Sequence, residues 1–93
     1  MNAVSAVVLI RAEVDLVNEL AKALVEIRGV AEVFSVSGQY DLVAIVRASN
    51  NDDLAEVIST RMRKLEGIKE TQTLIAFRVF SKAELEIGGL DVD

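Results

Sequence analysis

Two stretches of this sequence share one pattern at an offset of 38 residues. In each stretch, apolar residues recur at helical spacing, a glycine follows, and an apolar run begins directly after it. The matched pairs are Leu20 with Ile58, Leu24 with Met62, Ile27 with Leu65, Gly29 with Gly67, and Val30 with Ile68. Each half therefore predicts a helix that ends at a glycine and leads into a strand.

The helix of the first half is predicted over residues 14–28. The helix of the second half opens at residues 49–53, which are rich in N-capping residues and first-turn acids. The predicted apolar faces carry Val14, Val17, Leu20, Leu24 and Ile27 in the first helix, and Leu54, Val57, Ile58, Met62 and Leu65 in the second.

Four apolar runs predict strands, and the short connection at Gly38 makes the second and third a hairpin. The predicted strands are Val4–Ile10, Ala31–Ser37, Tyr40–Arg47 and Glu70–Phe80. The resulting order βαββαβ predicts an α+β fold, a ferredoxin-like sandwich with both helices on one face of an antiparallel sheet.

The predicted strands are apolar on both faces, although two helices can cover only one. Val7 and Leu9 alternate with Val8 and Ile10, and Val43 and Ile45 alternate with Leu42, Ala44 and Val46. Soluble monomers rarely expose an apolar patch of that size. We therefore expect a homodimer through opposed β-sheets, a dimeric α+β barrel.

The chain contains no His and no Cys. It therefore lacks the usual general base near neutral pH, the commonest transition-metal ligand, and any thiolate nucleophile. We see no paired carboxylates whose surroundings would separate an acid from a base. The sequence predicts no catalytic residue, no metal ligand and no cofactor, so it favours binding over catalysis.

Charge argues against a nucleic-acid surface. The net charge is −5, and residues 1–82 carry 10 basic against 11 acidic side chains, so this body is nearly neutral. The one basic cluster, at Arg61, Arg63 and Lys64, falls at a predicted helix C-terminus, where cations complement the helix dipole. The apolar run Val4–Ile10 is too short to span a membrane, which requires a helix of about 20 residues. We expect a cytoplasmic protein with no direct nucleic-acid or membrane partner.

The segment from Ser37 through Gly38, Gln39 and Tyr40 to Asp41 is suited to a small zwitterion. A glycine turn presents backbone N–H groups to a carboxylate, and a nearby acid can receive an ammonium group. Hydroxyls of the last strand, at Thr71 and Thr73, could complete the site. Structural explanations stay open: Gly38 as a turn glycine, Asp41 as an acid that binds nearby amides, and the threonines as strand formers.

The residues Val33-x-x-Val36-Ser37-Gly38-x-Tyr40-Asp41-Leu42-Val43, followed by Leu65-x-Gly67-Ile68-x-x-Thr71-x-Thr73, resemble the effector-binding (RAM) domain of the Lrp/AsnC feast/famine transcriptional regulators. The resemblance implies dimers made by opposed sheets, assembly into octamers or similar rings, and an amino-acid effector between neighbouring dimers. By position, the effector loop would hold Gly38, Tyr40 and Asp41.

Family regulators normally begin with a helix-turn-helix domain, for which 93 residues leave no room, so the chain resembles the stand-alone RAM proteins. We hypothesise that the module senses an amino acid and modulates a full-length Lrp/AsnC regulator. We expect a domain over residues 1–80 and an acidic tail or short extra strand over 81–93. Two alternatives remain: a small cofactor-free enzyme of the dimeric α+β barrel type, and an ACT-like regulatory partner without a ligand.

Overall fold

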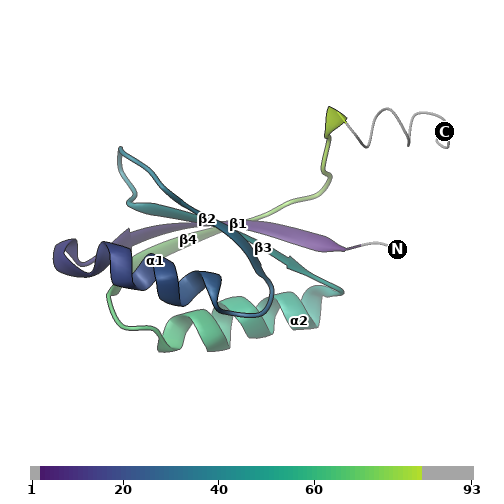
Figure 1. Cartoon of the computed structure of the whole chain (residues 1–93). Helices are drawn as coiled ribbons and strands as arrows, with labels where there is room; N and C mark the ends of the chain where they lie inside the picture. Colours follow the sequence, from purple (N-terminus) through teal and green to yellow (C-terminus); the bar gives the residue numbers. More distant parts are fainter. Residues whose placement is uncertain (1–2, 83–93) are drawn as a thin grey trace, which may run out of the picture.

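A computed structural model describes residues 3–82 and confirms the order βαββαβ. The strands are β1 (Val4–Ala12), β2 (Val30–Ser35), β3 (Leu42–Ala48) and β4 (Ile68–Ile75). They form one sheet in the order β2-β3-β1-β4, and every neighbouring pair is antiparallel. Both helices lie against the same face of this sheet (Figure 1), as the sequence predicts.

The first helix, α1 (Val17–Val25), follows a 3₁₀ turn at Val14–Leu16. The second begins as α2 (Asn51–Ala55) and continues through a π-helical segment, Glu56–Arg61, and a final 3₁₀ turn, Met62–Lys64. The Asn50 side chain accepts a hydrogen bond from the backbone N–H of Asp53 at 2.8 Å. The predicted capping segment therefore starts this helix, and the predicted basic cluster lies at its end.

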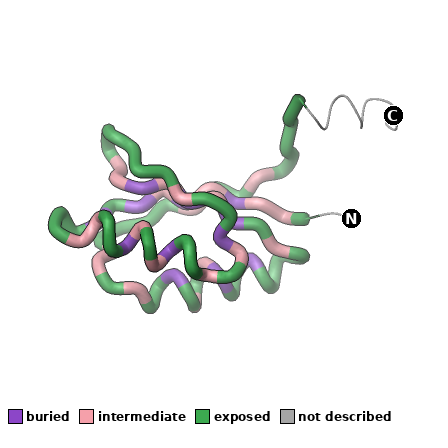
Figure 2. The backbone as a smooth tube through the Cα atoms, viewed as in Figure 1, coloured by how far each residue is buried: buried purple, intermediate pink, exposed green. Residues whose placement is uncertain are grey.

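The core lies between the helices and the covered face of the sheet (Figure 2). Alternate residues of β1 and β3 point into it, together with the apolar faces of both helices. Its fully buried large side chains are Val8, Ile10, Leu20, Leu24, Leu42 and Val46. Each such side chain stabilises the fold by about 1.5–3 kcal/mol relative to its exposed state.

The two glycines of the repeat allow the two halves of the chain to approach each other closely. Gly29 and Gly67 adopt φ of +105° and +102°, a region that other residues rarely enter. A Cβ on Gly29 would lie 2.8 Å from Val57 Cγ2, and a Cβ on Gly67 would lie 3.2 Å from Leu16 Cβ. Each glycine thus packs against the helical segment of the opposite half, which explains why the pattern occurs twice.

Several predicted bounds differ from the structure: α1 ends at Val25, β2 ends at Ser35 and β3 begins at Leu42. Two further differences have a clear physical reason. Val14 is 85% exposed, because the chain enters the helix through a 3₁₀ turn that directs this residue outward. The last strand ends at Ile75 and not at Phe80. Ala76 N donates to Ser5 O at 2.9 Å, and β1 begins one residue earlier, so no partner strand continues beyond this point in the described chain.

The face of the sheet opposite the helices, here called the open face, is apolar and uncovered in the described chain. Register places Leu9 opposite Val43 and Val7 opposite Ile45, and all four are only half-buried. Phe34 and Leu74 lie beside them at 49% and 46% exposure. The predicted two-sided apolar pattern is confirmed. The predicted extra strand in 81–93 lies almost wholly outside the described residues.

Candidate functional site

The predicted effector loop joins β2 to β3 and is closed at its base by backbone hydrogen bonds. Val36 N donates to Asp41 O at 3.0 Å, and Asp41 N donates to Ile10 O at 2.9 Å. Gly38 has φ +131°, and a Cβ added there would meet no atom within 4 Å, so its conformation and not crowding requires glycine. The base of the loop is therefore fixed, and its tip is exposed.

Asp41 attaches this loop to the neighbouring strand. Its Oδ2 accepts a hydrogen bond from Ala12 N at 2.8 Å. Ala12 lies two residues along β1 from Ile10, whose carbonyl accepts the bond from the Asp41 backbone amide. The side chain thus extends the β1–β3 ladder after the backbone has turned away. Within residues 3–82, no hydrogen bond reaches the second carboxylate oxygen.

Tyr40 reaches across the open face of the sheet. Its hydroxyl donates to Gln72 Oε1 on β4 at 2.8 Å, and Gln72 lies opposite Leu9 in register. The sequence analysis did not select Gln72. The available signal was strand parity, because Gln72 alternates with Thr71 and Thr73 and must therefore lie on the other face.

A pocket of about 400 Å³ lies beside the loop. Three of the predicted residues line it, Gly38, Gln39 and Tyr40, together with Arg11 of β1 and Glu70 of β4. Arg11 Nη1 lies 3.4 Å from Glu70 Oε1, and both side chains are about half exposed. An ion pair so exposed adds little stability and opens at small cost. The guanidinium and the carboxylate are thus available to a ligand, a property that neither residue's position in the sequence had indicated.

The structure does not bring Thr71 and Thr73 to this loop. Register places them opposite Ile10 and Val8, so they lie on the helix-covered side of β4. Thr71 lines a separate pocket of about 350 Å³, beside Arg63 and Lys69. Ser37 is exposed at the loop and does not line the pocket beside it. Within one chain, the predicted site residues therefore form two separate groups.

No cluster of three or more acidic side chains in the described part of the chain could hold a metal ion. Across residues 3–82, no helix has the length and apolar character needed to cross a membrane.

Comparison with known proteins gives consistent matches. The sequence model described as "Lrp/AsnC ligand binding domain" matches residues 5–85. An uncharacterized HTH-type transcriptional regulator of Pyrococcus horikoshii is 36% identical over 59 residues, which is 63% of this chain and 39% of the regulator. The chain spans about two fifths of the length of the curated regulators it matches.

Solved structures of other proteins share the fold of this chain. A Thermus thermophilus protein, TTHA0845, superposes with a TM-score of 0.79 at 43% identity, over 85% of this chain and 99% of that one. A feast or famine regulatory protein from M. tuberculosis, solved in complex with L-methionine, superposes with a TM-score of 0.69 at 25% identity. That match covers 85% of this chain and 53% of the other.

Proposed function

Because this chain belongs to the Lrp/AsnC ligand-binding domain family, we propose that it is an amino-acid-sensing regulatory module whose effector binds beside the β2–β3 loop. The observation that carries the proposal is the composition of the loop pocket. The backbone at Gly38 and Gln39, the Arg11 guanidinium, the Glu70 carboxylate and Tyr40 line it, and Asp41 lies at the base of the same loop. The complex of the M. tuberculosis relative with L-methionine supports an amino acid as the ligand class.

An α-amino acid offers one carboxylate and one ammonium group to this pocket. The guanidinium of Arg11 and the backbone amides at Gly38 and Gln39 suit the carboxylate, since Arg binds carboxylates through paired hydrogen bonds. The free oxygen of Asp41 and the carboxylate of Glu70 suit the ammonium group. Tyr40, held by Gln72, forms a wall of the pocket.

The module assembles, in this proposal, by burying its open face against a second copy. The half-exposed Phe34 and Leu74 continue the apolar surface of Val7, Leu9, Val43 and Ile45. Burial of apolar area is worth about 25 cal/mol per Å², so several such side chains supply a substantial association energy. Beyond β4, Phe77, Val79 and Phe80 are also exposed apolar residues.

Dimers then assemble into an octamer or similar ring, with the effector between neighbouring dimers. The predicted loop residues and the two predicted threonines lie apart within one chain, which supports a site shared between subunits. Thr71 and Thr73 lie on the helix-covered side of β4 and the loop pocket lies on the other, so threonines of a neighbouring subunit are better placed to complete it.

The downstream role is regulatory and non-enzymatic. The chain would act in the cytoplasm by mixed assembly with a full-length Lrp/AsnC regulator or by competing with it for effector. A cofactor-free enzyme would enclose its substrate within a protomer or dimer, whereas the loop pocket lies at an exposed hairpin end. An ACT-like partner would assemble without any ligand.

Isothermal titration calorimetry with the twenty L-amino acids tests the proposal. We expect at least one saturable binder, with affinity reduced at least about tenfold in Arg11→Gln, which removes one charged hydrogen-bonding partner. Arg78→Gln removes the same charge away from the loop pocket and should bind as the wild type does. Absence of any binder at millimolar concentration would contradict the proposal.

A further inference from the structure

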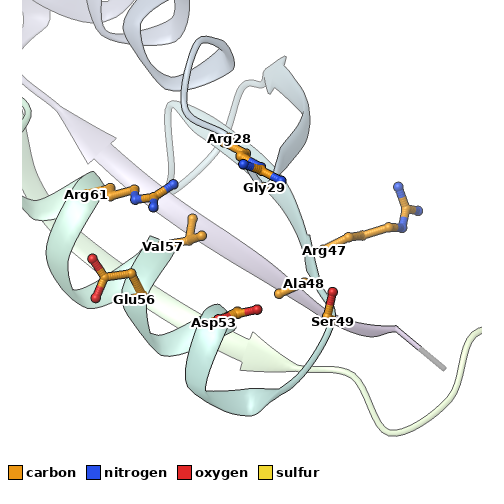
Figure 3. A pocket seen from close by; sticks show the side chains of 9 residues that line it. All are labelled: Arg28, Gly29, Arg47, Ala48, Ser49, Asp53, Glu56, Val57 and Arg61. Atoms are coloured by element: carbon orange, nitrogen blue, oxygen red, sulfur yellow. The ribbon is translucent and has the colours of Figure 1, made fainter.

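A second pocket, of about 440 Å³, lies at the opposite end of the β2–β3 hairpin, where β2 begins and β3 ends (Figure 3). The strands of the hairpin separate it from the loop pocket by about 20 Å, given a rise of about 3.4 Å per residue. It is lined by the turn before β2, the end of β3 and the second helix. Nothing in the proposed effector site uses it.

Two guanidinium groups reach this pocket from opposite sides. Figure 3 shows Arg28, from the turn before β2, and Arg61, from the second helix, directed toward the same space. Arg47 extends away, because it lies opposite Ser5 in register and its side chain belongs to the open face. Among the described residues, no side-chain hydrogen bond or ion pair engages any of these three arginines.

The walls of the pocket are held in place. Arg47 N donates to Gly29 O at 2.8 Å, which joins the turn before β2 to the end of β3. A Cβ on Gly29 would come within 2.8 Å of Val57 Cγ2, so the turn touches the helix closely at the pocket floor. The Asn50 cap fixes the start of the helix and therefore the backbone of Asp53.

The remaining polar groups are carboxylates and a hydroxyl. Asp53 and Glu56 line the pocket from the helix, and Ser49 lines it directly after β3. Figure 3 shows the Glu56 carboxylate directed away from the space between Arg28 and Arg61. Neither carboxylate forms an ion pair with an arginine of the pocket in the described chain. The pocket thus presents unpaired guanidinium donors from two sides and unpaired carboxylates from the helix.

We propose that this pocket is a second ligand site, which binds a small molecule through a phosphate or carboxylate group placed between Arg28 and Arg61. Planar guanidinium groups bind both anions through paired, charge-assisted hydrogen bonds. Hydroxyl or amino groups of the same ligand meet Asp53 and Ser49. The site is independent of the effector site, and it stands if amino-acid binding at the loop fails.

The same carboxylate chemistry could come from the chain itself. Residues 83–93 contain Glu84, Glu86, Asp91 and Asp93 and no basic residue. The described chain leaves β4 beside Ser5, the residue opposite Arg47, and therefore at the end of the sheet where the pocket lies. The experiment must separate a free anion from these acidic side chains.

The test is a titration of the ¹⁵N-labelled full chain with inorganic phosphate and, separately, citrate, at constant ionic strength, followed by amide chemical shifts. We expect saturable shifts at Gly29, Ala48 and Ser49. Arg28→Gln and Arg61→Gln should each weaken binding by about fivefold or more, since each removes a charge-assisted contact. Arg78→Gln loses the same charge from an exposed residue that does not line this pocket and should stay within about twofold of the wild type. A well-dispersed spectrum for each variant confirms that it has folded.

A full-length variant with the four tail acids replaced by Gln or Asn separates the two sources. Equal affinity in this variant and the wild type assigns the site to free anions. Tighter binding, or binding only in this variant, supports the site with the tail carboxylates as its occupant. No saturable shift in either protein would overturn the proposal. An equal loss in Arg78→Gln would also overturn it, because general electrostatics would then explain the binding.

Discussion

Asp41 accepts a hydrogen bond from the backbone N–H of Ala12 at 2.8 Å, so the acid expected to hold a ligand also fixes the strand beneath it. Ala12 is buried, and its amide would otherwise lack this acceptor. One carboxylate oxygen serves the fold, and no hydrogen bond within residues 3–82 reaches the other. Variants at this position must therefore be analysed for stability and for binding separately.

Asp41→Ala should destabilise the fold by about 1–3 kcal/mol, because the amide of Ala12 loses its acceptor in a buried position. Asp41→Asn keeps an oxygen acceptor and removes the charge, so it should lose less than half as much stability. Urea denaturation measures both. If the proposed ammonium contact exists, Asp41→Asn should still lose effector affinity. Equal stability of Asp41→Ala and wild type would contradict the role assigned to this hydrogen bond.

The bond from Tyr40 to Gln72 should contribute little to stability and more to the order of the loop. Both side chains are accessible to water, so a double-mutant cycle with Tyr40→Phe and Gln72→Ala should give a coupling energy of about 0.5–1 kcal/mol. Thermal denaturation of the four proteins supplies the values. A coupling energy indistinguishable from zero would show that the bond does not hold Tyr40 in solution.

Assembly should depend on the open face and not on apolar exposure in general. Phe34 on the open face and Val25 on α1 are each 49% exposed in the single chain. Phe34→Lys should shift the wild-type mass from at least twice 10.1 kDa toward a monomer in light scattering, because a charge in an apolar interface is costly. Val25→Lys should leave the mass unchanged. A monomeric wild type at micromolar concentration would refute assembly through this face.

Gly29 and Gly38 form a matched pair that separates the cost of crowding from the cost of backbone strain. Gly29→Ala should destabilise more than Gly38→Ala, although both have positive φ, because only the first would contact Val57 Cγ2 at 2.8 Å. The strained backbone alone costs about 1–3 kcal/mol, and crowding adds to it at Gly29. Equal losses in chemical denaturation would mean that Val57 shifts freely.

Most of the fold could be predicted from the pattern that repeats at an offset of 38 residues. The glycine-to-strand junctions and apolar periodicity determined the element order, because those features depend on local geometry and on one shared core. The end of β4 depends on a partner strand, and no pattern within Ala76–Phe80 reveals where β1 begins. Val14 fits a helical period by spacing alone, although a 3₁₀ turn directs it outward.

The candidate site was only partly predictable. The loop residues were selected because a glycine turn followed by Tyr and Asp is a local signal, and their role in binding stays a prediction. Gln72, Arg11 and Glu70 come from two other strands, and only the β1–β4 register places them beside the loop. Thr71 and Thr73 satisfied the motif, but strand parity directs them to the other face.

The most direct test of the account is a ¹⁵N chemical-shift titration of the full chain with each of the twenty L-amino acids. The account predicts saturable binding of at least one, with the largest shifts at Gly38, Gln39, Tyr40 and Asp41 and at Arg11 and Glu70. Absence of binding at millimolar concentration would contradict it, as would shifts confined to residues away from the loop.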